Sequence, residues 1–475
     1  MVLKRFYNEK LAQASYLIGC SATGESVVID PNRDADQYIE EAQREGLQIT
    51  AVTETHIHAD YLSGTRELAA RTGATMYLSD EGTADWKYLF ANGPGAKLVK
   101  DGDTIRIGNV RLDVVATPGH TPEHISFILT DEPASDQPLG VFSGDFIFVG
   151  DVGRPDLLER AANIKGTMEA GGRQLYGSLQ RFSHHSDGLI IWPGHGAGSA
   201  CGKSLGGVPV SSLGYEKAAN WAFKVKSEQE FVDEVLTGQP DPPKYFAMMK
   251  KLNKEGPALL NGIKTPKRLD AEGVIKAVGT DAQVVDVRDG DVASLGFIRG
   301  TINIPLNKYF TTYSGWMLSY ERPIILIAET LEEAEQATYD LAMIGLDNVT
   351  GWVGNEVFSS YTGELGTIPS VPASAMDGFD GVLLDVRSDR ERAEGHVPGS
   401  IHVPLWYLSE RTAEVPTDRK IAVYCGSGGR SRVAATVLNR HGICNLCNVT
   451  GGFGEYMSRG LPIQVGSGVG EPVAK

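Results

Sequence analysis

The chain has 475 residues, which at roughly 150 residues per domain is enough for about three domains, each with its own core. Its formal net charge of -16 argues against nucleic acid or an anionic membrane as a partner, because both are bound through clustered Lys and Arg. Few cysteines, no N-terminal signal pattern and no apolar run of the roughly 18 residues that a membrane span needs together predict a cytoplasmic protein with reduced thiols.

Candidate metal ligands in the first half of the chain share one sequence context, because each follows a short apolar run with β character. The runs cover residues 49–53, 112–116, 141–144 and 189–192. The polar residues that follow them are His56, His58, Asp60, His120, Asp145 and His195. Side chains at strand ends converge on one edge of a layered sheet structure, and imidazole with carboxylate is a typical ligand set for a transition metal. The pattern therefore predicts a metal site.

This pattern resembles the metallo-β-lactamase fold superfamily over roughly residues 1–240. The motif of that superfamily is His-x-His-x-Asp-His, followed by a distal His, a bridging Asp and a last His. The resemblance implies an αββα sandwich. In binuclear hydrolases of the superfamily, the residues that match His56, His58 and His120 hold one metal. The second metal is held by the matches of Asp60, Tyr61 and His195, with the match of Asp145 as a bridge.

Tyr61 departs from the motif, because the hydrolases have histidine at this position. A neutral phenol is a poor substitute for imidazole, so a tightly held second zinc is not expected. The closer resemblance is to persulfide dioxygenases, a branch of the glyoxalase II-like group. It implies one Fe(II) with open positions for substrate and O2, held by His56, His120 and Asp145. The residues then expected to orient ligands and water around the metal are His58, Asp60 and His195.

Two further residues near this site each have two interpretations. Arg154 lies in a Gly-Arg-x-Asp loop that resembles one in persulfide dioxygenases, where the arginine lies near the thiol substrate. It either binds a carboxylate or phosphate of the substrate or forms a surface salt bridge. Cys201 follows His195 in a loop of small residues. It is either a reactive thiol whose pKa is lowered by Lys203, or a buried structural cysteine.

The remainder of the chain contains an internal repeat. Asp286-Val287-Arg288 recurs as Asp385-Val386-Arg387, and a Gly-x-Ile-x-x-Pro segment at residues 300–305 recurs at 399–404. A period of roughly 100 residues indicates duplicated domains, because the units of a solenoid are shorter. Apolar runs alternate with helix-like stretches in both copies, which is typical of an α/β domain with a parallel sheet.

The last copy carries a candidate active-site loop. A buried strand at residues 421–424 leads directly into Cys425, a glycine-rich loop, Arg430 and a helical stretch. Backbone N–H groups of such a loop and the helix N-terminus form an anion cradle that stabilises a thiolate or persulfide. The cradle residues are Gly426, Ser427, Gly428 and Gly429.

The Cys-x4-Arg spacing resembles rhodanese sulfurtransferases, whereas related phosphatases use a loop one residue longer. The resemblance implies that Cys425 and Arg430 are catalytic and that residues 426–429 bind the substrate. The middle copy has neither cysteine nor arginine at the matching residues 327–333, so we expect it to act as a docking or spacing element. The predicted architecture is multidomain, with a metallo-β-lactamase αββα sandwich at 1–240, a connector at 241–265, a rhodanese-like domain without catalytic cysteine at 266–366 and a rhodanese domain at 367–475.

The order of these parts resembles fused persulfide dioxygenase–rhodanese proteins. That resemblance implies oxidation of a low-molecular-weight persulfide by O2 to sulfite and thiol, with sulfur transfer through Cys425 yielding thiosulfate in sulfide detoxification. One alternative is a zinc-dependent glyoxalase II-like thioester hydrolase fused to a sulfurtransferase, with zinc held by His56, His58 and His120. Another is a non-catalytic sulfur carrier. The identity of the persulfide's thiol stays open, and a homo-oligomer, either dimer or tetramer, is expected.

Overall fold

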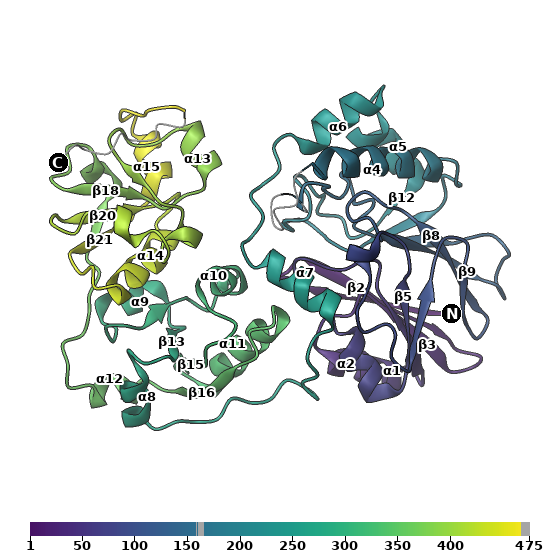
Figure 1. The fold of residues 1–475 in the computed structure, drawn as a ribbon, viewed down its shortest axis with the longest axis horizontal. Helices are drawn as coiled ribbons and strands as arrows, with labels where there is room; N and C mark the ends of the chain where they lie inside the picture. The colour runs from purple at the N-terminus through teal and green to yellow at the C-terminus, as the bar shows by residue number, and fades with distance from the viewer. Residues whose placement is uncertain (158, 160–165, 467–475) are drawn as a thin grey trace. The chain divides into compact units, whose positions relative to one another are not determined.

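The structure is a computed structural model that describes residues 1–157, 159 and 166–466 (Figure 1). Contacts between residues divide the chain into two compact units. The first comprises Met1–Ile263 with Ala342–Gly345, and the second comprises Lys264–Leu341 with Leu346–Lys475. Within the described ranges, no helix has the length and apolar composition that crossing a bilayer requires.

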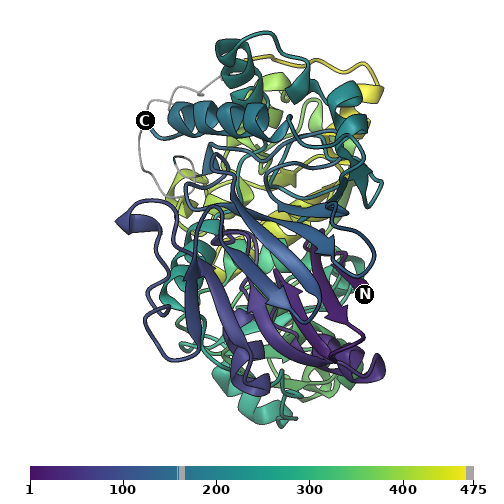
Figure 2. The same ribbon diagram turned by 90° about the vertical axis from the view of Figure 1, so that its right-hand side faces the viewer.

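The first unit is built on two six-stranded sheets, with orders β1-β2-β3-β4-β5-β6 and β12-β11-β10-β9-β8-β7. The first sheet consists of β1 (Val2–Asn8), β2 (Gln13–Cys20), β3 (Glu25–Ile29), β4 (Gln48–Thr53), β5 (Thr75–Ser79) and β6 (Ala96–Val99). The second consists of β7 (Thr104–Ile107), β8 (Val110–Ala116), β9 (Ile125–Asp131), β10 (Gly140–Gly144), β11 (Ile190–Pro193) and β12 (Ser211–Ser212). Their long strands are drawn in purple and blue in Figure 2.

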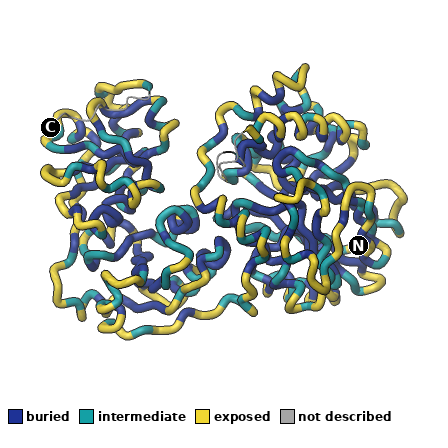
Figure 3. The backbone as a smooth tube through the Cα atoms, in the orientation of Figure 1, coloured by how far each residue is buried: buried dark blue, intermediate teal, exposed yellow. Residues whose placement is uncertain are grey.

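Apolar side chains of both sheets fill the space between them, including Ile18 and Val27 from the first sheet and Leu112 and Phe127 from the second. Each such side chain stabilises the fold by about 1.5–3 kcal/mol when it is fully buried. Figure 3 shows the buried backbone concentrated in these strands, while the connecting loops are largely exposed.

Helices cover the outer face of each sheet. On the first sheet, α1 (Ala35–Arg44) and α2 (Thr65–Thr72) contribute Tyr38 and Leu68 to a second cluster. On the second sheet, α4 (Met168–Phe182) and α6 (Glu228–Leu236) contribute Leu175 and Phe231 to a third cluster. The other helices of this unit that lie wholly within the described residues are η1 (Ala84–Trp86), α5 (Leu213–Ala219), η2 (Trp221–Phe223) and α7 (Phe246–Glu255). The predicted αββα sandwich is therefore confirmed.

The second unit contains two smaller sheets with the orders β14-β13-β15-β16 and β17-β21-β20-β18-β19, and their strands pair in parallel. Their strands are β13 (Gln283–Asp286), β14 (Ile302–Asn303), β15 (Ile324–Ile327), β16 (Val349–Val353), β17 (Ser370–Pro372), β18 (Val382–Asp385), β19 (Ile401–His402), β20 (Ile421–Tyr424) and β21 (Leu446–Thr450). The helices are α8 (Ala271–Ala277), α9 (Gly290–Leu295), α10 (Phe310–Met317), α11 (Leu331–Met343), α12 (Glu356–Ser360), η3 (Ala373–Met376), α13 (Asp389–Glu394), η4 (Leu405–Tyr407), η5 (Thr412–Glu414), α14 (Gly429–Arg440) and α15 (Gly452–Ser458).

The two sheets repeat one another, because β14-β13-β15-β16 and β19-β18-β20-β21 have the same order along the chain and in space. The repeated Asp-Val-Arg motif makes the same contacts in both. Arg288 pairs with Asp286 at 2.7 Å and donates to the carbonyl of Gly296 at 2.9 Å. Arg387 pairs with Asp385 at 2.7 Å and donates to the carbonyl of residue 395 at 2.8 Å.

The segment predicted as a connector contains α7, and this helix contacts the metal-site region of the first unit. The side-chain amide of Asn253 donates to the backbone carbonyls of His58 and Tyr61, each at 2.8 Å. The first unit accordingly extends to Ile263. The residue boundaries of the individual domains otherwise stay predictions.

Candidate metal centre and candidate sulfur-transfer loop

Three side chains expected to bind iron lie together in the first unit. Donor atoms of His56, His120 and Asp145 lie within 4.8 Å of one another, and all three residues are buried. They follow β4, β8 and β10 respectively. Oδ2 of Asp145 lies 3.4 Å from Nε2 of His120 and 3.9 Å from Nε2 of His56.

The donor atoms of this group fit a divalent cation. Among the described residues, neither Nε2 of His56 nor Oδ2 of Asp145 has a hydrogen-bond partner, although both atoms are buried. Buried polar atoms without partners are costly, and a cation between them would remove that cost. Two imidazoles and one carboxylate are also a ligand set that suits non-haem Fe(II).

The imidazoles are oriented through their other nitrogens. Nδ1 of His120 donates to the carbonyl of Arg154 at 3.0 Å. Nδ1 of His56 is hydrogen-bonded to Oγ1 of Thr55 at 2.9 Å, and that hydroxyl donates to Asp30 at 2.9 Å. Burial holds the pKa of His56 well below its ordinary value, with neighbouring histidines adding to the effect, and burial also lowers the pKa of His120. Both rings are therefore neutral and present Nε2 as a ligand atom.

Asp30 is a buried residue that the sequence motifs did not reveal. It follows β3 with a φ of 51° and accepts from the backbone N–H of Thr55 at 2.6 Å. Its Oδ1 also lies 3.1 Å from Nε2 of His58. The carboxylate of Asp30 thus orients two imidazole rings. It contacts the ring of His58 directly and the ring of His56 through the hydroxyl of Thr55. No motif marks it, because Asp30 and His58 lie on different loops.

His58 and Tyr61 both lie beside this group without joining it. Among the described residues, Nδ1 of His58 has no partner, and His58 is not one of the three donors within 4.8 Å. The hydroxyl of Tyr61 donates to the carbonyl of Asp30 at 3.2 Å. Burial raises the pKa of Tyr61 well above its ordinary value, and nearby carboxylates raise it further. Tyr61 is therefore a neutral phenol.

A second group of donors contains Asp60, His195 and Cys201, which are also buried and also lie within 4.8 Å of one another. Nε2 of His195 is 2.7 Å from Oδ2 of Asp60, and its Nδ1 is 2.7 Å from Oδ1 of Asp145. Burial alone would lower the pKa of His195, but the two carboxylates outweigh it and hold the pKa well above its ordinary value. Asp145 therefore contacts both groups: its Oδ2 faces His56 and His120, and its Oδ1 contacts His195.

Cys201 is not activated in the way the sequence suggested. Burial raises the pKa of its thiol well above the ordinary value, and the carboxylates of Asp60 and Asp145 raise it further. Lys203, expected to lower that pKa, ion-pairs with Glu234 at 2.7 Å. As a metal-free thiol, Cys201 is therefore neutral at pH 7 and is not a ready nucleophile.

Arg154, expected to bind substrate or to form a surface salt bridge, makes its side-chain contacts inside the protein. Its side chain is fully buried, with two 2.7 Å hydrogen bonds to Asp156 and one of 3.1 Å to the carbonyl of Ala200. Its backbone N–H donates to the carbonyl of Cys201 at 3.2 Å, and its own carbonyl accepts from His120. Arg154 therefore holds the Cys201 loop and the His120 ring, and these contacts lend no support to substrate binding. The alternative of a surface salt bridge is wrong, because the Asp156 pair is buried.

We expect Arg154→Met to lower the free energy of unfolding by about 3–5 kcal/mol, because it removes one partner of a buried ion pair. Denaturant unfolding of the full chain measures the effect. Arg106→Met is the matched control, since the Arg106–Glu132 pair is exposed and its loss costs about 0–1 kcal/mol. Equal destabilisation by both substitutions would contradict the role given to Arg154.

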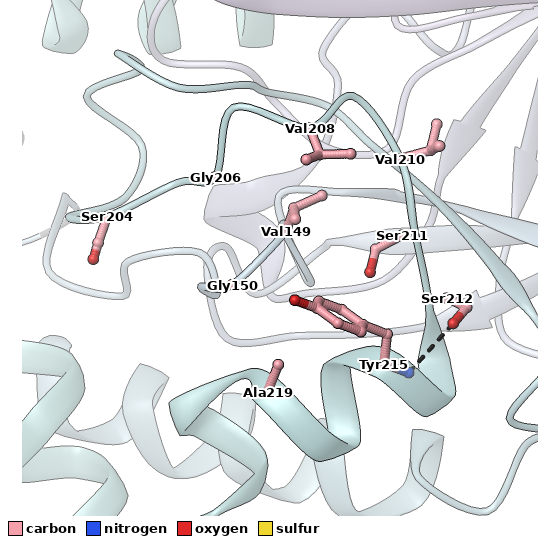
Figure 4. A pocket seen from close by; sticks show the side chains of 10 residues that line it. All are labelled: Val149, Gly150, Ser204, Gly206, Val208, Val210, Ser211, Ser212, Tyr215 and Ala219. Carbon is pink, nitrogen blue, oxygen red and sulfur yellow. Dashed lines mark hydrogen bonds between the residues drawn. The ribbon is translucent and has the colours of Figure 1, made fainter.

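A surface pocket of about 430 Å³ lies on the first unit, apart from the candidate ligands (Figure 4). It is lined by Val149, Gly150, Ser204, Gly206, Val208, Val210, Ser211, Ser212, Tyr215 and Ala219. In Figure 4 the Tyr215 ring lies beneath Val149, and the backbone N–H of Tyr215 donates to Ser212 at 3.3 Å. None of the candidate metal ligands is among the lining residues.

In the second unit, the predicted cysteine loop joins β20 directly to α14. Cys425 is buried, and the backbone N–H of Gly428 donates to its Sγ at 3.1 Å. The hydroxyl of Ser431 lies 3.6 Å from the same sulfur. Gly428 has a φ of 107°, a conformation that favours glycine and turns its N–H toward the sulfur. The loop thus presents one backbone donor to the sulfur, and the hydroxyl of Ser431, on α14, lies near both the sulfur and Oδ1 of Asn448, the latter at 2.6 Å.

Arg430 lies in the first turn of α14, directly after this loop, and is already paired. Its guanidinium makes two hydrogen bonds, of 2.7 and 2.6 Å, to Glu391 on α13. Burial alone would raise the pKa of Glu391, but the hydrogen bonds from Arg430 outweigh it and lower the pKa to about 2. Glu391 therefore stays ionised and neutralises the positive charge that was expected to face the sulfur. Sequence reasoning missed Glu391, because its capping box with Ser388 marks only a helix start.

Aromatic residues of the middle copy, residues 266–366 (the middle module), lie near the Cys425 loop of the last copy (the last module). Tyr313 on α10 packs against Trp316 at 5.5 Å between ring centroids, and Trp316 packs against Trp406 of the last module at 5.1 Å. Burial raises the pKa of Tyr313, and its electrostatic neighbours include Arg430 and Cys425. The two modules are also joined by a hydrogen bond of 3.1 Å, from the backbone N–H of residue 303 to the hydroxyl of residue 436. The middle module thus contributes side chains to the surroundings of Cys425.

Known protein families match both the N-terminal and the C-terminal part of the chain. The sequence model described as the metallo-beta-lactamase superfamily matches residues 9–195, and that of the rhodanese-like domain matches residues 373–459. The chain is 27% identical to the mitochondrial persulfide dioxygenase ETHE1 of Bos taurus, over 49% of this chain and 79% of that protein. It is 32% identical to the hydroxyacylglutathione hydrolase of a Polaromonas species, over 38% of this chain and 61% of that protein.

A solved structure covers more of the chain. The metallo-beta-lactamase from Staphylococcus aureus is 44% identical, with a TM-score of 0.67, and the match covers 74% of this chain and 99% of that one. The resemblances to persulfide dioxygenases and to rhodaneses that the motifs indicated are thereby confirmed at the level of homology. The chain belongs to the metallo-beta-lactamase superfamily and carries a rhodanese-like domain near its C-terminal end.

Proposed function

We propose that the first unit is a non-haem iron persulfide dioxygenase. The overall reaction is R-S-SH + O2 + H2O → R-SH + SO3²⁻ + 2 H⁺. The observation that carries this proposal is the donor set of His56, His120 and Asp145 beside a neutral Tyr61. When bound there, one Fe(II) would supply open coordination positions for the persulfide and O2. The homologous persulfide dioxygenases support the same reaction class.

The chain's own residues have defined tasks around that metal. Arg154 and Thr55 accept the Nδ1 hydrogens of His120 and His56, which fixes both rings. Asp145 is held in turn by His195, which donates to its Oδ1 at 2.7 Å. Burial of these side chains excludes bulk water, so the protein rather than the solvent sets the geometry of the donors.

The second unit is proposed to transfer the sulfane sulfur. The Cys425 thiolate attacks R-S-SH, forms an S–S bond to the outer sulfur and releases the thiol R-SH. Sulfite then attacks the outer sulfur of the Cys425 persulfide, which gives thiosulfate and restores the thiolate. The N–H of Gly428 and the hydroxyl of Ser431 support the anion at Sγ. Sulfite made in the first unit is thus an acceptor for the second.

A zinc-dependent thioester hydrolase is the second candidate. Two observations favour it, the unpartnered Nδ1 of His58 among the described residues and the homology to hydroxyacylglutathione hydrolases. The two candidates are distinguished by metal analysis of the purified full chain, with oxygen uptake on glutathione persulfide and hydrolysis of a glutathione thioester measured in parallel. We expect oxygen uptake with iron. Thioester turnover with zinc and no oxygen uptake after iron reconstitution would overturn the proposal.

We expect Tyr313→Ala to lower kcat/KM for thiosulfate formation about 10-fold, since an aromatic contact contributes about 0.5–1.5 kcal/mol beyond its buried area. The reason is that Tyr313 is buried near Arg430 and Cys425, although it belongs to the middle module. Tyr309→Ala is the matched control, because Tyr309 stacks on Tyr313 but is 47% exposed. If both variants transfer sulfur like the parent protein, the middle module is only a spacer.

A further inference from the structure

The ion pair between Arg430 and Glu391 lies beside the sulfur-transfer loop. The two terminal nitrogens of Arg430 donate to the two carboxylate oxygens of Glu391 at 2.7 and 2.6 Å. A Cβ placed on Gly426, the residue after Cys425, would lie 3.3 Å from Nη2 of Arg430 and 3.8 Å from Oε1 of Glu391. The carboxylate of Glu391 therefore borders the backbone next to the reactive thiol.

The start of α13 holds Glu391 in this position. Its Oε2 accepts the backbone N–H of Ser388 at 3.0 Å, and its own backbone N–H donates to the hydroxyl of Ser388 at 3.1 Å. The backbone carbonyl of Glu391 accepts from Nη1 of Arg387 at 3.2 Å. These contacts fix the carboxylate where it meets Arg430.

The pair occupies the part of the Arg430 guanidinium that recognises oxyanions. Arginine binds planar and tetrahedral oxyanions through a fork of two parallel N–H groups, and Glu391 takes one hydrogen bond from each terminal nitrogen. Arg432, two residues further along α14, also pairs with a carboxylate, that of Asp291 in the middle module at 2.5 Å. Both arginines at the start of α14 are thus already bound to acidic side chains.

The charge of a sulfur donor decides how strongly this arrangement opposes it. In attack on thiosulfate, Cys425 forms an S–S bond to the outer sulfur, the original S–S bond breaks and sulfite leaves with the electron pair: Cys-S⁻ + S-SO3²⁻ → Cys-S-S⁻ + SO3²⁻. Three negative charges meet in that step, whereas a thiolate and a protonated persulfide R-S-SH bring only one. The ionised Glu391 adds a further negative charge, so it disfavours thiosulfate much more than a persulfide.

We propose that Glu391 is a specificity-determining residue, which closes the Arg430 fork to sulfur oxyanions and makes the loop accept sulfur from persulfides in preference to thiosulfate. The inference rests on the sulfur transfer through Cys425 proposed above and names its class of donor. Sulfite attack on the Cys425 persulfide is the reverse of the thiosulfate step. The carboxylate therefore slows both directions equally and leaves their equilibrium unchanged.

The first test is the binding of thiosulfate to the full chain with Cys425→Ser, which cannot take up sulfur, by isothermal titration at constant ionic strength. Glu391→Gln in this background should lower the dissociation constant about 10-fold, because it frees the Arg430 fork and removes a negative charge. A larger effect is not expected, since the side chains of the pair are 21% and 34% exposed and solvent screens them. Unchanged or weaker binding would overturn the inference.

Glutamine is the informative replacement, because its side-chain oxygen can still accept the backbone N–H of Ser388 and keep the start of α13. Tighter binding is also a gain that a misfolded variant cannot imitate. Glu394→Gln is the matched control, since Glu394 lies on the same helix but pairs with the exposed Arg390 at 3.0 Å. It should bind thiosulfate like the parent background.

The second test is the rate at which Cys425 is loaded with sulfur from thiosulfate or from the persulfide of mercaptoethanol, whose organic group is uncharged. The readout is the gain of one sulfur atom in the mass of the peptide that contains Cys425. The ratio of the two second-order rate constants, thiosulfate over persulfide, should rise about 10-fold in Glu391→Gln and stay unchanged in Glu394→Gln.

A parent protein that is loaded from thiosulfate as fast as from the persulfide would overturn the inference and leave the proposed sulfur transfer intact. Loading from neither donor would refute the proposed transfer instead. The titration with Cys425→Ser would still decide, without any turnover, whether Glu391 weakens the binding of a sulfur oxyanion.

Discussion

Cys425→Ser abolishes sulfur transfer to sulfite, with a loss of at least about three orders of magnitude, the scale measured when a covalent nucleophile is removed from other enzymes. The reason is that a serine hydroxyl is not ionised at pH 7 and cannot carry a sulfane sulfur as a persulfide. The backbone N–H of Gly428 donates to the sulfur of Cys425, and the hydroxyl of Ser431 lies 3.6 Å from it. Residues 426–431 contain no second thiol. Thiosulfate formation from glutathione persulfide and sulfite is the measurement.

Oxygen uptake by the same variant should stay within about twofold of the parent protein, because Cys425 belongs to the second unit and the candidate iron ligands to the first. Cys447→Ser is the matched control, since Cys447 is a buried cysteine on β21 of the same module. Unchanged thiosulfate formation after loss of Cys425 would show that the loop only stores sulfur or does nothing.

His120→Ala should lower iron content and oxygen uptake by more than about 100-fold, because loss of an outer-shell partner alone costs about 10–100-fold at metal sites. His120 supplies one of three donors, and its ring is fixed by the carbonyl of Arg154. With alanine, only His56 and Asp145 remain in that group. Iron per chain and the initial rate of oxygen uptake on glutathione persulfide are measured on the same preparation.

His184→Ala is the matched control, because His184 is exposed at the end of α4 and contributes to neither donor group. Sulfur transfer through Cys425 should be retained in His120→Ala. Full oxygen uptake by that variant would exclude His120 as a ligand and would point to a donor set that uses His58 instead.

Local sequence signals selected residues that the structure brings together. His56, His120 and Asp145 each follow a strand whose apolar run is visible in the sequence, and the sheets bring those strand ends together. Cys425 follows a buried strand and precedes a helix in the same way. These signals work because the residue and the element that positions it are adjacent in the chain.

Residues that contact the site from distant parts of the chain could not be selected in this way. Asp30 holds His58 from another strand end, Asn253 reaches the same segment from α7, and Glu391 neutralises Arg430 from α13. Nothing in the local pattern of these residues distinguishes them from ordinary polar side chains. The direction of a side chain is equally hidden, since Lys203 turns to Glu234 although it is close to Cys201 in sequence.

The two Asp-Val-Arg motifs show which contacts hold the fold of each copy independently of the cysteine loop. In both copies, the arginine closes the end of a strand by holding an aspartate and the carbonyl of a glycine that lies eight residues further along the chain. None of these three residues belongs to the segment that carries the cysteine loop in the last copy. The contacts that close the strand end therefore do not depend on the cysteine loop, and the middle copy keeps them although it has no cysteine in the matching segment.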